Sequence, residues 1–157
     1  MSSLSTSAYG GSFTAQVNAA YNTADPNQLT LAAYPNVFGY DESKIAASPA
    51  ASFSDFDKGY QSPVSLSTAL TVGRGYTAQI GNTEKVQFTG PLNNNTQTIS
   101  GLTYAAAGTS GSASAGWALI GNPYPAPLDW RTVGNSGSSL SGVDGAAYVF
   151  QSTSAYS

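Results

Sequence analysis

The side chains of this chain that could do chemistry are its carboxylates, because the sequence contains no His and no Cys. Without His, the usual acid–base arrangements and most serine-nucleophile arrangements are excluded. Without Cys, thiol nucleophiles, thiolate metal sites and disulfides are excluded. A pair of carboxylates could still hydrolyse a glycoside, but none of them stands in a local sequence typical of an acid held in an apolar pocket. We therefore expect no enzyme.

Two of the carboxylates, Asp55 and Asp57, are separated by one residue, which is the spacing of alternate ligands in calcium-binding loops. A complete loop of that kind also needs further oxygen ligands and a distal Glu, and no Glu stands at the required offset. The segment predicts a solvated turn, with a Ca²⁺ site at Asp55 and Asp57 as the alternative. No other cofactor is expected.

Aromatic residues around a proline-rich bend are the best candidates for ligand binding. Tyr124 and Trp130 flank this bend, and exposed Tyr and Trp rings can stack on sugar rings while their polar tips form hydrogen bonds. Asp129 either joins this ligand-binding group or accepts backbone N–H bonds within the bend. The alternative is that Trp117 and Trp130 are core residues, because large aromatic side chains contribute much of the burial energy of a small core.

Residues 73–78, Gly-Arg-Gly-Tyr-Thr-Ala, match the glycine pattern of dinucleotide-binding sites with Ala in the third place. Such a site requires a strand before the pattern and a helix that begins at the glycines, so that the helix N-terminus meets the pyrophosphate. Here the residues after Gly75 are strand-like and lead into a turn. They predict a β-bend whose glycines allow close packing of strands.

Charge is scarce in this chain of 157 residues, because 8% of them are charged and the net charge is −3. The five basic residues form no local cluster, which argues against nucleic acid and anionic membranes as partners. No apolar run approaches the roughly 20 residues that cross a bilayer, so membrane insertion is not expected. Hydrophobic residues make up 41% of the chain and are sufficient for a core.

Residues 1–12 are small and polar and are expected to be a flexible lead-in, while residues 13–157 are expected to form one domain. In that domain, apolar and polar residues alternate at Phe13, Ala15 and Val17, and further strand-like segments lie at 29–33 and 37–40. Turn residues recur about every ten positions, and helical periodicity is scarce. The pattern predicts an all-β fold, an antiparallel and jelly-roll-like β-sandwich with long Gly/Ser-rich loops.

The clearest local prediction is a hairpin over residues 76–88. Its strands are separated by Gly81 and Asn82, and Gly in the first central position suits a tight turn because it tolerates positive φ. Residues 96–104 are predicted to add a third strand. Two more strands are expected at the segments 116–120, with Trp117 buried, and 146–151.

Residues 116–130 read Gly-Trp-Ala-Leu-Ile-Gly-Asn-Pro-Tyr-Pro-Ala-Pro-Leu-Asp-Trp. This segment resembles a bend motif of large secreted proteins of the Bacteroidota, where it lies in a β-rich region upstream of a type IX secretion sorting domain. Residues 73–76, followed by 88–90 and 92–93, look like the meander that precedes the motif in that family, and residues 148–150 look like the strand that follows it. The resemblance covers about residues 34–151.

The resemblance implies an extracellular or cell-surface location, and it carries over no catalytic residue. The sorting domain is absent and relatives continue into further strands, so we expect an excised module that is either smaller than this range or lacks its last C-terminal strands. Pro123 and Pro125 hold the motif extended, because proline fixes φ near about −65°. The motif is therefore expected to be a structural corner, with Trp117 packed in the core.

These observations predict a non-catalytic structural or adhesive module of a secreted or cell-surface bacterial protein. The alternative is a carbohydrate-binding module of a secreted polysaccharide-active protein, so the expected partners are a second copy of the chain or a glycan. Residues 146–151 contain no charge and no proline, and an unpaired edge there would accept a strand from another chain. We expect self-association through this strand, unless it is a central strand paired on both sides.

Overall fold

A computed structural model of the chain describes residues 3–6, 13–23, 34–45, 57–81, 83–104, 115–135 and 140–149. The chain divides into two compact units, Met1–Pro125 and Ala126–Ser157. The boundary lies in the proline-rich bend, inside the range 13–157 that the sequence predicts as one domain. All strands in the described residues belong to the first unit.

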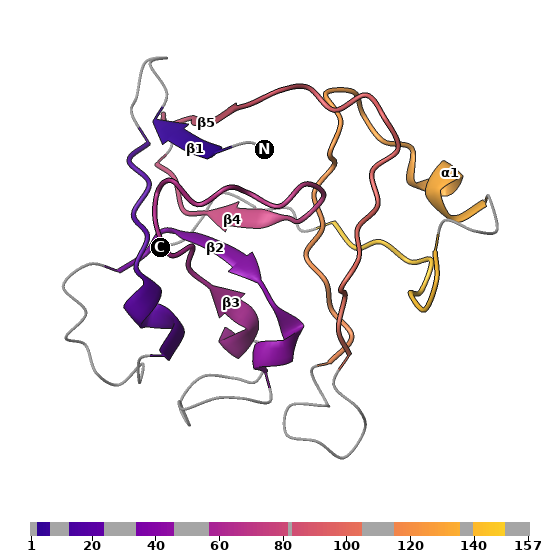
Figure 1. Cartoon of the computed structure of the whole chain (residues 1–157), viewed down its shortest axis with the longest axis horizontal. Coiled ribbons are helices and arrows are strands. Elements are labelled where there is room, and N and C mark those ends of the chain that lie inside the picture. The colour runs from indigo at the N-terminus through magenta and orange to yellow at the C-terminus, as the bar shows by residue number, and fades with distance from the viewer. Residues whose placement is uncertain are drawn as a thin grey trace. The chain divides into compact units, whose positions relative to one another are not determined.

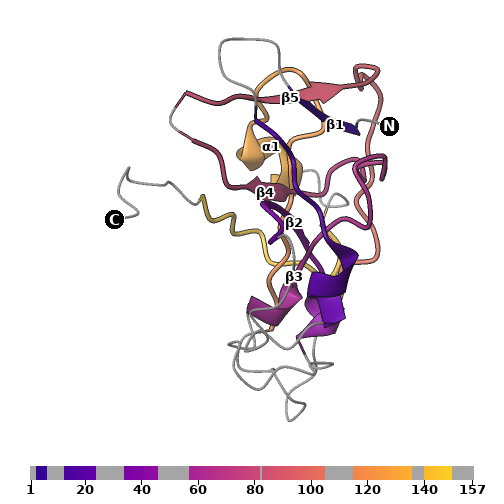
Figure 2. The ribbon, with the colours of Figure 1, turned by 90° about the vertical axis from the view of Figure 1, so that its left-hand side faces the viewer.

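The first unit is organised around a three-stranded antiparallel sheet (Figures 1 and 2). In spatial order its strands are β3 (Tyr60–Gln61), β2 (Val37–Tyr40) and β4 (Tyr76–Ala78). The register places Tyr60 opposite Tyr40, and Tyr76 opposite Gly39. The middle strand β2 confirms the strand-like segment predicted at residues 37–40.

A second, two-stranded antiparallel sheet pairs β1 (Ser3–Thr6) with β5 (Val86–Thr89). Strand β1 lies within residues 1–12, where the sequence predicts a lead-in rather than a strand. Its four residues include one large apolar residue, Leu4, so they show no alternation. The pairing with β5, which is distant in sequence, therefore specifies this strand.

The core of the first unit contains Phe13, Ala15 and Val37, which are 1%, 7% and 0% exposed. The polar residues between Phe13 and Ala15 and after Ala15 are exposed, which confirms the alternation that the sequence predicts. Val17 and Val86 pack against this cluster. Because Val37 lies on β2 and Val86 on β5, strands of both sheets border the same core.

Asn36 connects the apolar segment to the sheet. Its side-chain Oδ1 accepts a hydrogen bond from the backbone N–H of Gln16 (2.7 Å), and its Nδ2 donates to the carbonyl of Thr14 (3.0 Å). Its backbone N–H donates to the carbonyl of Gln16 (3.0 Å), and its carbonyl accepts from the N–H of Gln79 (2.9 Å), just beyond β4. A single residue thus joins residues 13–17 to both β2 and β4.

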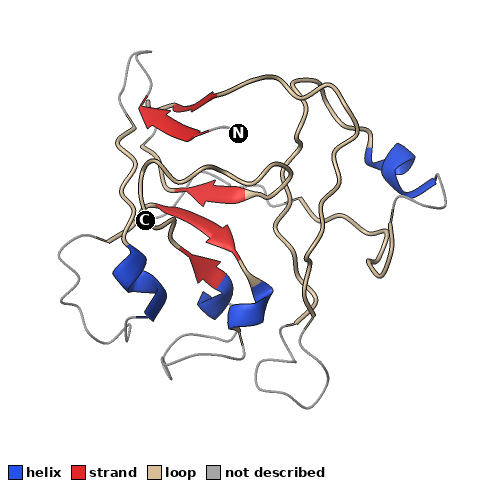
Figure 3. Cartoon of the chain, in the orientation of Figure 1, coloured by secondary structure: helices blue, strands red, loops and turns tan. Residues whose placement is uncertain are grey.

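Helix is scarce in the part of the chain that the structure describes (Figure 3). The helical segments are η1 (Ala19–Thr23), η2 (Glu42–Lys44), η3 (Asp57–Gly59) and α1 (Trp130–Asn135). None of these described helices has the length and apolar character needed to cross a membrane. The low helix content and the antiparallel strands confirm the predicted β-rich class.

The predicted hairpin over residues 76–88 is wrong. Strand β4 pairs with β2 and strand β5 with β1, so the two arms belong to different sheets. A turn does follow Gly81, whose carbonyl accepts from the N–H of Glu84 (3.0 Å) and whose N–H donates to Glu84 Oε2 (2.6 Å). Asn82 lies outside the described residues. Turn residues therefore predicted the turn correctly but not the partners of the strands on either side.

Three other predicted strands differ from the structure. Residues 96–104 form no strand, and residues 116–120 contribute an isolated bridge in which Ile120 pairs with Arg74. Trp117 is 46% exposed, so the prediction that it is buried is wrong. The described residues 146–149 form no strand either.

The physical reason lies in what flanks these segments. Gly101 and Gly116 have φ of 66° and 92°, which interrupt an extended strand. Tyr148 and Val149 are 78% and 90% exposed, so their apolar character is not used in a sheet. Residues 29–33, 150 and 151 lie outside the described residues.

Asn36→Ala removes both side-chain hydrogen bonds from Gln16 and Thr14. Because one hydrogen bond contributes a net 0.5–1.5 kcal/mol or so, we expect the free energy of unfolding to fall by about 1–3 kcal/mol. Denaturant unfolding followed by circular dichroism measures this change. Asn95→Ala is the matched control, since Asn95 is exposed. An equal loss in both variants would contradict the connecting role of Asn36.

Candidate functional site

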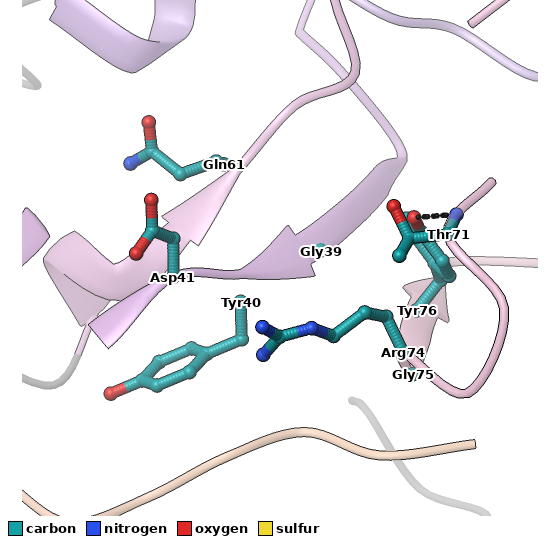
Figure 4. A pocket seen from close by; sticks show the side chains of 8 residues that line it. All are labelled: Gly39, Tyr40, Asp41, Gln61, Thr71, Arg74, Gly75 and Tyr76. Carbon is teal, nitrogen blue, oxygen red and sulfur yellow. Dashed lines mark hydrogen bonds between the residues drawn. The ribbon is translucent and has the colours of Figure 1, made fainter. Parts of the chain in front are cut away.

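An open pocket of about 230 Å³ lies beside the end of β2 (Figure 4). Its lining comes from the end of β2, from β3 and from the loop that leads into β4. The lining residues are Gly39, Tyr40, Asp41, Gln61, Thr71, Arg74, Gly75 and Tyr76. Figure 4 shows Asp41 and Gln61 at one end, Thr71 at the other, and the Arg74 guanidinium pointing toward the Tyr40 ring between them.

A turn over residues 71–74 shapes the loop before β4. The N–H of Arg74 donates to the carbonyl of Thr71 (3.1 Å), and Gly73 has φ of 79°, a conformation that favours glycine. Strand β4 follows the Gly-Arg-Gly pattern directly, with no helix. The predicted β-bend is therefore confirmed.

Two tyrosines lie among the lining residues, and close packing holds both of their rings. The Tyr76 ring lies over Gly39, where an added Cβ would come within 3.3 Å of the ring, and its hydroxyl accepts from the N–H of Thr71 (3.0 Å). Tyr40 is 9% exposed, and its ring contacts Tyr60 edge-to-face with centroids 5.2 Å apart. Both rings are thus fixed before any ligand arrives.

One cation and one carboxylate lie among the lining residues. Arg74 Nη2 donates to the carbonyls of Ser100 (2.9 Å) and Gly101 (3.0 Å), which anchors the guanidinium. Asp41 precedes η2, and its Oδ1 accepts from the N–H (3.0 Å) and the hydroxyl (2.7 Å) of Ser43. The formal charges of the lining therefore sum to zero.

The bend motif is bonded to the same loop from its other side. The N–H of Gly75 donates to the carbonyl of Leu119 (2.9 Å), and the N–H of Gly121 donates to the carbonyl of Gly73 (3.0 Å). An added Cβ at Gly75 would lie 2.7 Å from Leu119 Cγ, and one at Gly121 would lie 2.9 Å from the carbonyl oxygen of Arg74. Glycine is required at both positions because the backbones approach this closely.

Polar side chains hold the proline-rich part of the motif. Asn93 Nδ2 donates to the carbonyl of Pro123 (2.8 Å), and the N–H of Gln97 donates to the hydroxyl oxygen of Tyr124 (3.2 Å). Asn122 Oδ1 accepts from the N–H of Tyr124 (3.0 Å). The hydroxyl of Tyr124, a predicted ligand-binding residue, is therefore engaged within the fold.

The other predicted ligand-binding residues, Asp129 and Trp130, lie in the second unit at the start of α1. The carboxylate of Asp129 accepts from Nε (3.0 Å), Nη2 (2.8 Å) and the backbone N–H (3.1 Å) of Arg131. The side-chain and then the backbone hydrogen bonds of Arg131 hold the pKa of Asp129 below its ordinary value. Trp130 Nε1 donates to the carbonyl of Gly145 (2.8 Å). Of the three predicted ligand-binding residues, Asp129 and Trp130 therefore lie in the second unit, whereas Tyr124 belongs to the first unit.

The predicted calcium site can be followed only in part. Asp55 lies outside the described residues, and of Asp57 only the backbone is described, at the start of η3. Within the described part of the chain, no group of three or more His, Cys, Asp or Glu could hold a metal ion. The Ca²⁺ alternative stays a prediction.

The sequence did not indicate the pocket. Its only local signal was the pair of glycines around Arg74, which predicted a bend but no site. Gln61 joins the lining because antiparallel pairing places β3 beside β2, with Gln61 opposite Gly39. That pairing is not encoded in any local pattern around Gln61.

Comparisons of the chain with protein-family models, with curated proteins and with solved structures each find no match. The functional conclusion therefore depends on the residues and the geometry of this chain.

Gly121→Ala should destabilise the chain, because the new Cβ would meet the backbone of Arg74 and force the two segments apart. Overpacking of this kind costs about 1–3 kcal/mol. Gly145→Ala is the matched control, since a Cβ at Gly145 meets nothing within 4 Å. Thermal unfolding by circular dichroism should show a lower melting temperature for Gly121→Ala alone. Equal melting temperatures for both variants would contradict the close approach.

Proposed function

We propose that the chain is a non-catalytic structural or adhesive module of a secreted or cell-surface bacterial protein. The observation that supports this best is the way the bend motif bonds to its own chain. Backbone bonds join residues 119–121 to residues 73–75, and further bonds join Pro123 and Tyr124 to the segment 93–97. Polar groups that form these intrachain hydrogen bonds stabilise the fold. A ligand would have to bind through the same groups, and they are already used within the chain.

The extracellular location rests on the resemblance of this motif to secreted proteins of the Bacteroidota with type IX sorting domains. A structural role also explains why the motif contains prolines. Pro123 and Pro125 restrict the unfolded chain as well as the folded one, so they lower the entropy lost on folding. The small, uncharged surface residues and the absence of Cys are compatible with this location.

For the architecture we propose the antiparallel, jelly-roll-like β-sandwich. The support is that Val37 of β2 and Val86 of β5 border one core although they lie in different sheets. Facing sheets of a sandwich bury side chains between them in this manner.

Self-association is part of the adhesive proposal. The described residues 146–149 form no strand, so the predicted edge at 146–151 has lost its support. Strands β3 and β4 are instead the edges of the three-stranded sheet, and an edge strand is where a strand of another chain can add.

A carbohydrate-binding module is the second candidate, and the observation that favours it is the pocket beside β2. The pocket is lined by two tyrosines, Tyr40 and Tyr76, and by the charged residues Asp41 and Arg74. The two functions are compatible, because the bend motif bonds to the backbones on either side of Arg74 and leaves its side chain at the pocket.

Tyr124→Phe tests whether the motif serves the fold or a ligand. The variant removes the acceptor of the Gln97 N–H, so the free energy of unfolding should fall by about 0.5–1.5 kcal/mol. Tyr104→Phe is the control, because Tyr104 is 70% exposed. If Tyr124→Phe unfolds like the wild type in a denaturant titration, the hydroxyl has no structural role and this argument fails.

The location is tested on intact cells that produce the parent protein. A protease added to these cells should cut the module, because an exported module is accessible from outside. Immunoblotting with an antibody raised against the chain follows the cleavage, and a cytosolic protein that stays intact is the control. Cleavage that begins only after lysis would contradict the proposed location.

A further inference from the structure

The pocket beside β2 carries polar groups whose hydrogen-bonding capacity the described residues do not use. On the acceptor side these are Oδ2 of Asp41 and Oε1 of Gln61, and on the donor side Nε and Nη1 of Arg74. The hydroxyl of Thr71 adds a group that can do both. Polar residues from three separate segments of the chain thus line one small pocket (Figure 4).

Intrachain bonds hold these groups in place by their other atoms. Gln61 Nε2 donates to the carbonyls of Lys58 (3.0 Å) and Tyr60 (3.1 Å), which leaves Oε1 as its free end. Arg74 is anchored through Nη2 alone, and Asp41 through Oδ1 alone. Such fixed groups lose little conformational entropy when they bind a ligand.

The shape and charge of the pocket narrow the class of ligand. A volume of about 230 Å³ is smaller than the roughly 300–1,000 Å³ of pockets for drug-sized molecules, so it fits a single ring. Because Asp41 and Arg74 balance each other, the lining favours a neutral ligand over an ion. Hydrogen-bonding groups beside the Tyr76 ring call for a ligand with hydroxyl groups at its edge and C–H groups on its face.

We infer that this pocket binds one neutral pyranose ring of a saccharide. Asp41 and Gln61 accept hydrogen bonds from ring hydroxyls, Arg74 donates to hydroxyl oxygens, and a tyrosine ring contacts the C–H face of the sugar. This inference names the ligand of the carbohydrate-binding function proposed above and rests on that function. It does not depend on the structural function, because no bond of the bend motif uses these free atoms.

The test is a titration of the ¹⁵N-labelled chain with single sugars, followed by amide chemical shifts. The probes are the methyl glycosides of glucose, galactose and mannose, and of glucuronic acid as the charged comparison, each up to a concentration on the order of 10 mM. We expect at least one neutral glycoside to give saturable shifts at Gly39, Asp41, Gln61 and the loop 71–76. The glucuronide should bind no more tightly than its neutral counterpart.

Two variants connect the shifts to the pocket. Thr71→Trp fills the pocket from an exposed position without removing a side-chain hydrogen bond, and should weaken binding by about tenfold or more. Thr77→Trp is the matched control, an exposed residue of β4 outside the lining, and should bind like the wild type. Asp41→Asn keeps an oxygen for Ser43 but removes the charge, and should weaken binding even if Thr71→Trp fails to fold.

Absence of saturable shifts with all neutral glycosides would overturn the inference, and so would binding of the glucuronide alone. Shifts that Asp41→Asn leaves unchanged would also overturn it, because they would place the sugar elsewhere. None of these results bears on the structural function, which Tyr124→Phe and protease accessibility test separately.

Discussion

Strand β2 has four residues, and it can organise the first unit because Asn36, the residue before it, extends its hydrogen bonds in two directions. Toward residues 13–17, Asn36 makes three bonds, two through its side chain and one through its backbone N–H. Toward β4, its carbonyl adds one bond beyond the ladder. These bonds place Phe13 and Ala15 against Val37, and the core follows from that placement.

Aromatic contacts take the place of ion pairs in a chain with 8% charged residues. Phe38 lies between Tyr21 and Tyr60 edge-to-face, at centroid distances of 5.2 and 6.4 Å, and Tyr60 contacts Tyr40 in turn. Each such contact contributes about 0.5–1.5 kcal/mol beyond burial. Gly39 gives the Tyr76 ring room to lie on the sheet. Tyr40 and Tyr76 therefore belong both to the packing of the sheet and to the lining residues of the pocket.

Patterns among neighbouring residues predicted local features of the fold correctly, but they did not predict which strands pair with each other. The alternation at Phe13 and Ala15, the strand at 37–40 and the bend at Gly73 are recorded in neighbouring residues, and each was predicted. The hairpin failed because β4 finds its partner about forty residues earlier, at β2. Trp117 was expected in the core on its size alone, yet its segment meets the loop at Gly75 by backbone bonds that leave the ring half exposed. The pocket also depends on pairings between residues far apart in the sequence, so no local sequence pattern predicted it.

Arg74 is the residue at which the bend motif and the pocket meet. Its neighbours Gly73 and Gly75 bond to residues 119–121, so the bend motif fixes the backbone from which the side chain leaves. The guanidinium is then fixed a second time by the carbonyls of Ser100 and Gly101. The long and flexible side chain of Arg74 is thereby restricted at both ends. Its Nε and Nη1 atoms still carry N–H donors that the described residues do not use. The polar groups of the bend motif are hydrogen-bonded within the chain. As a result, the Arg74 guanidinium at the pocket is ordered before any ligand binds. The same set of bonds thus stabilises the chain and orders one side chain of the proposed binding pocket.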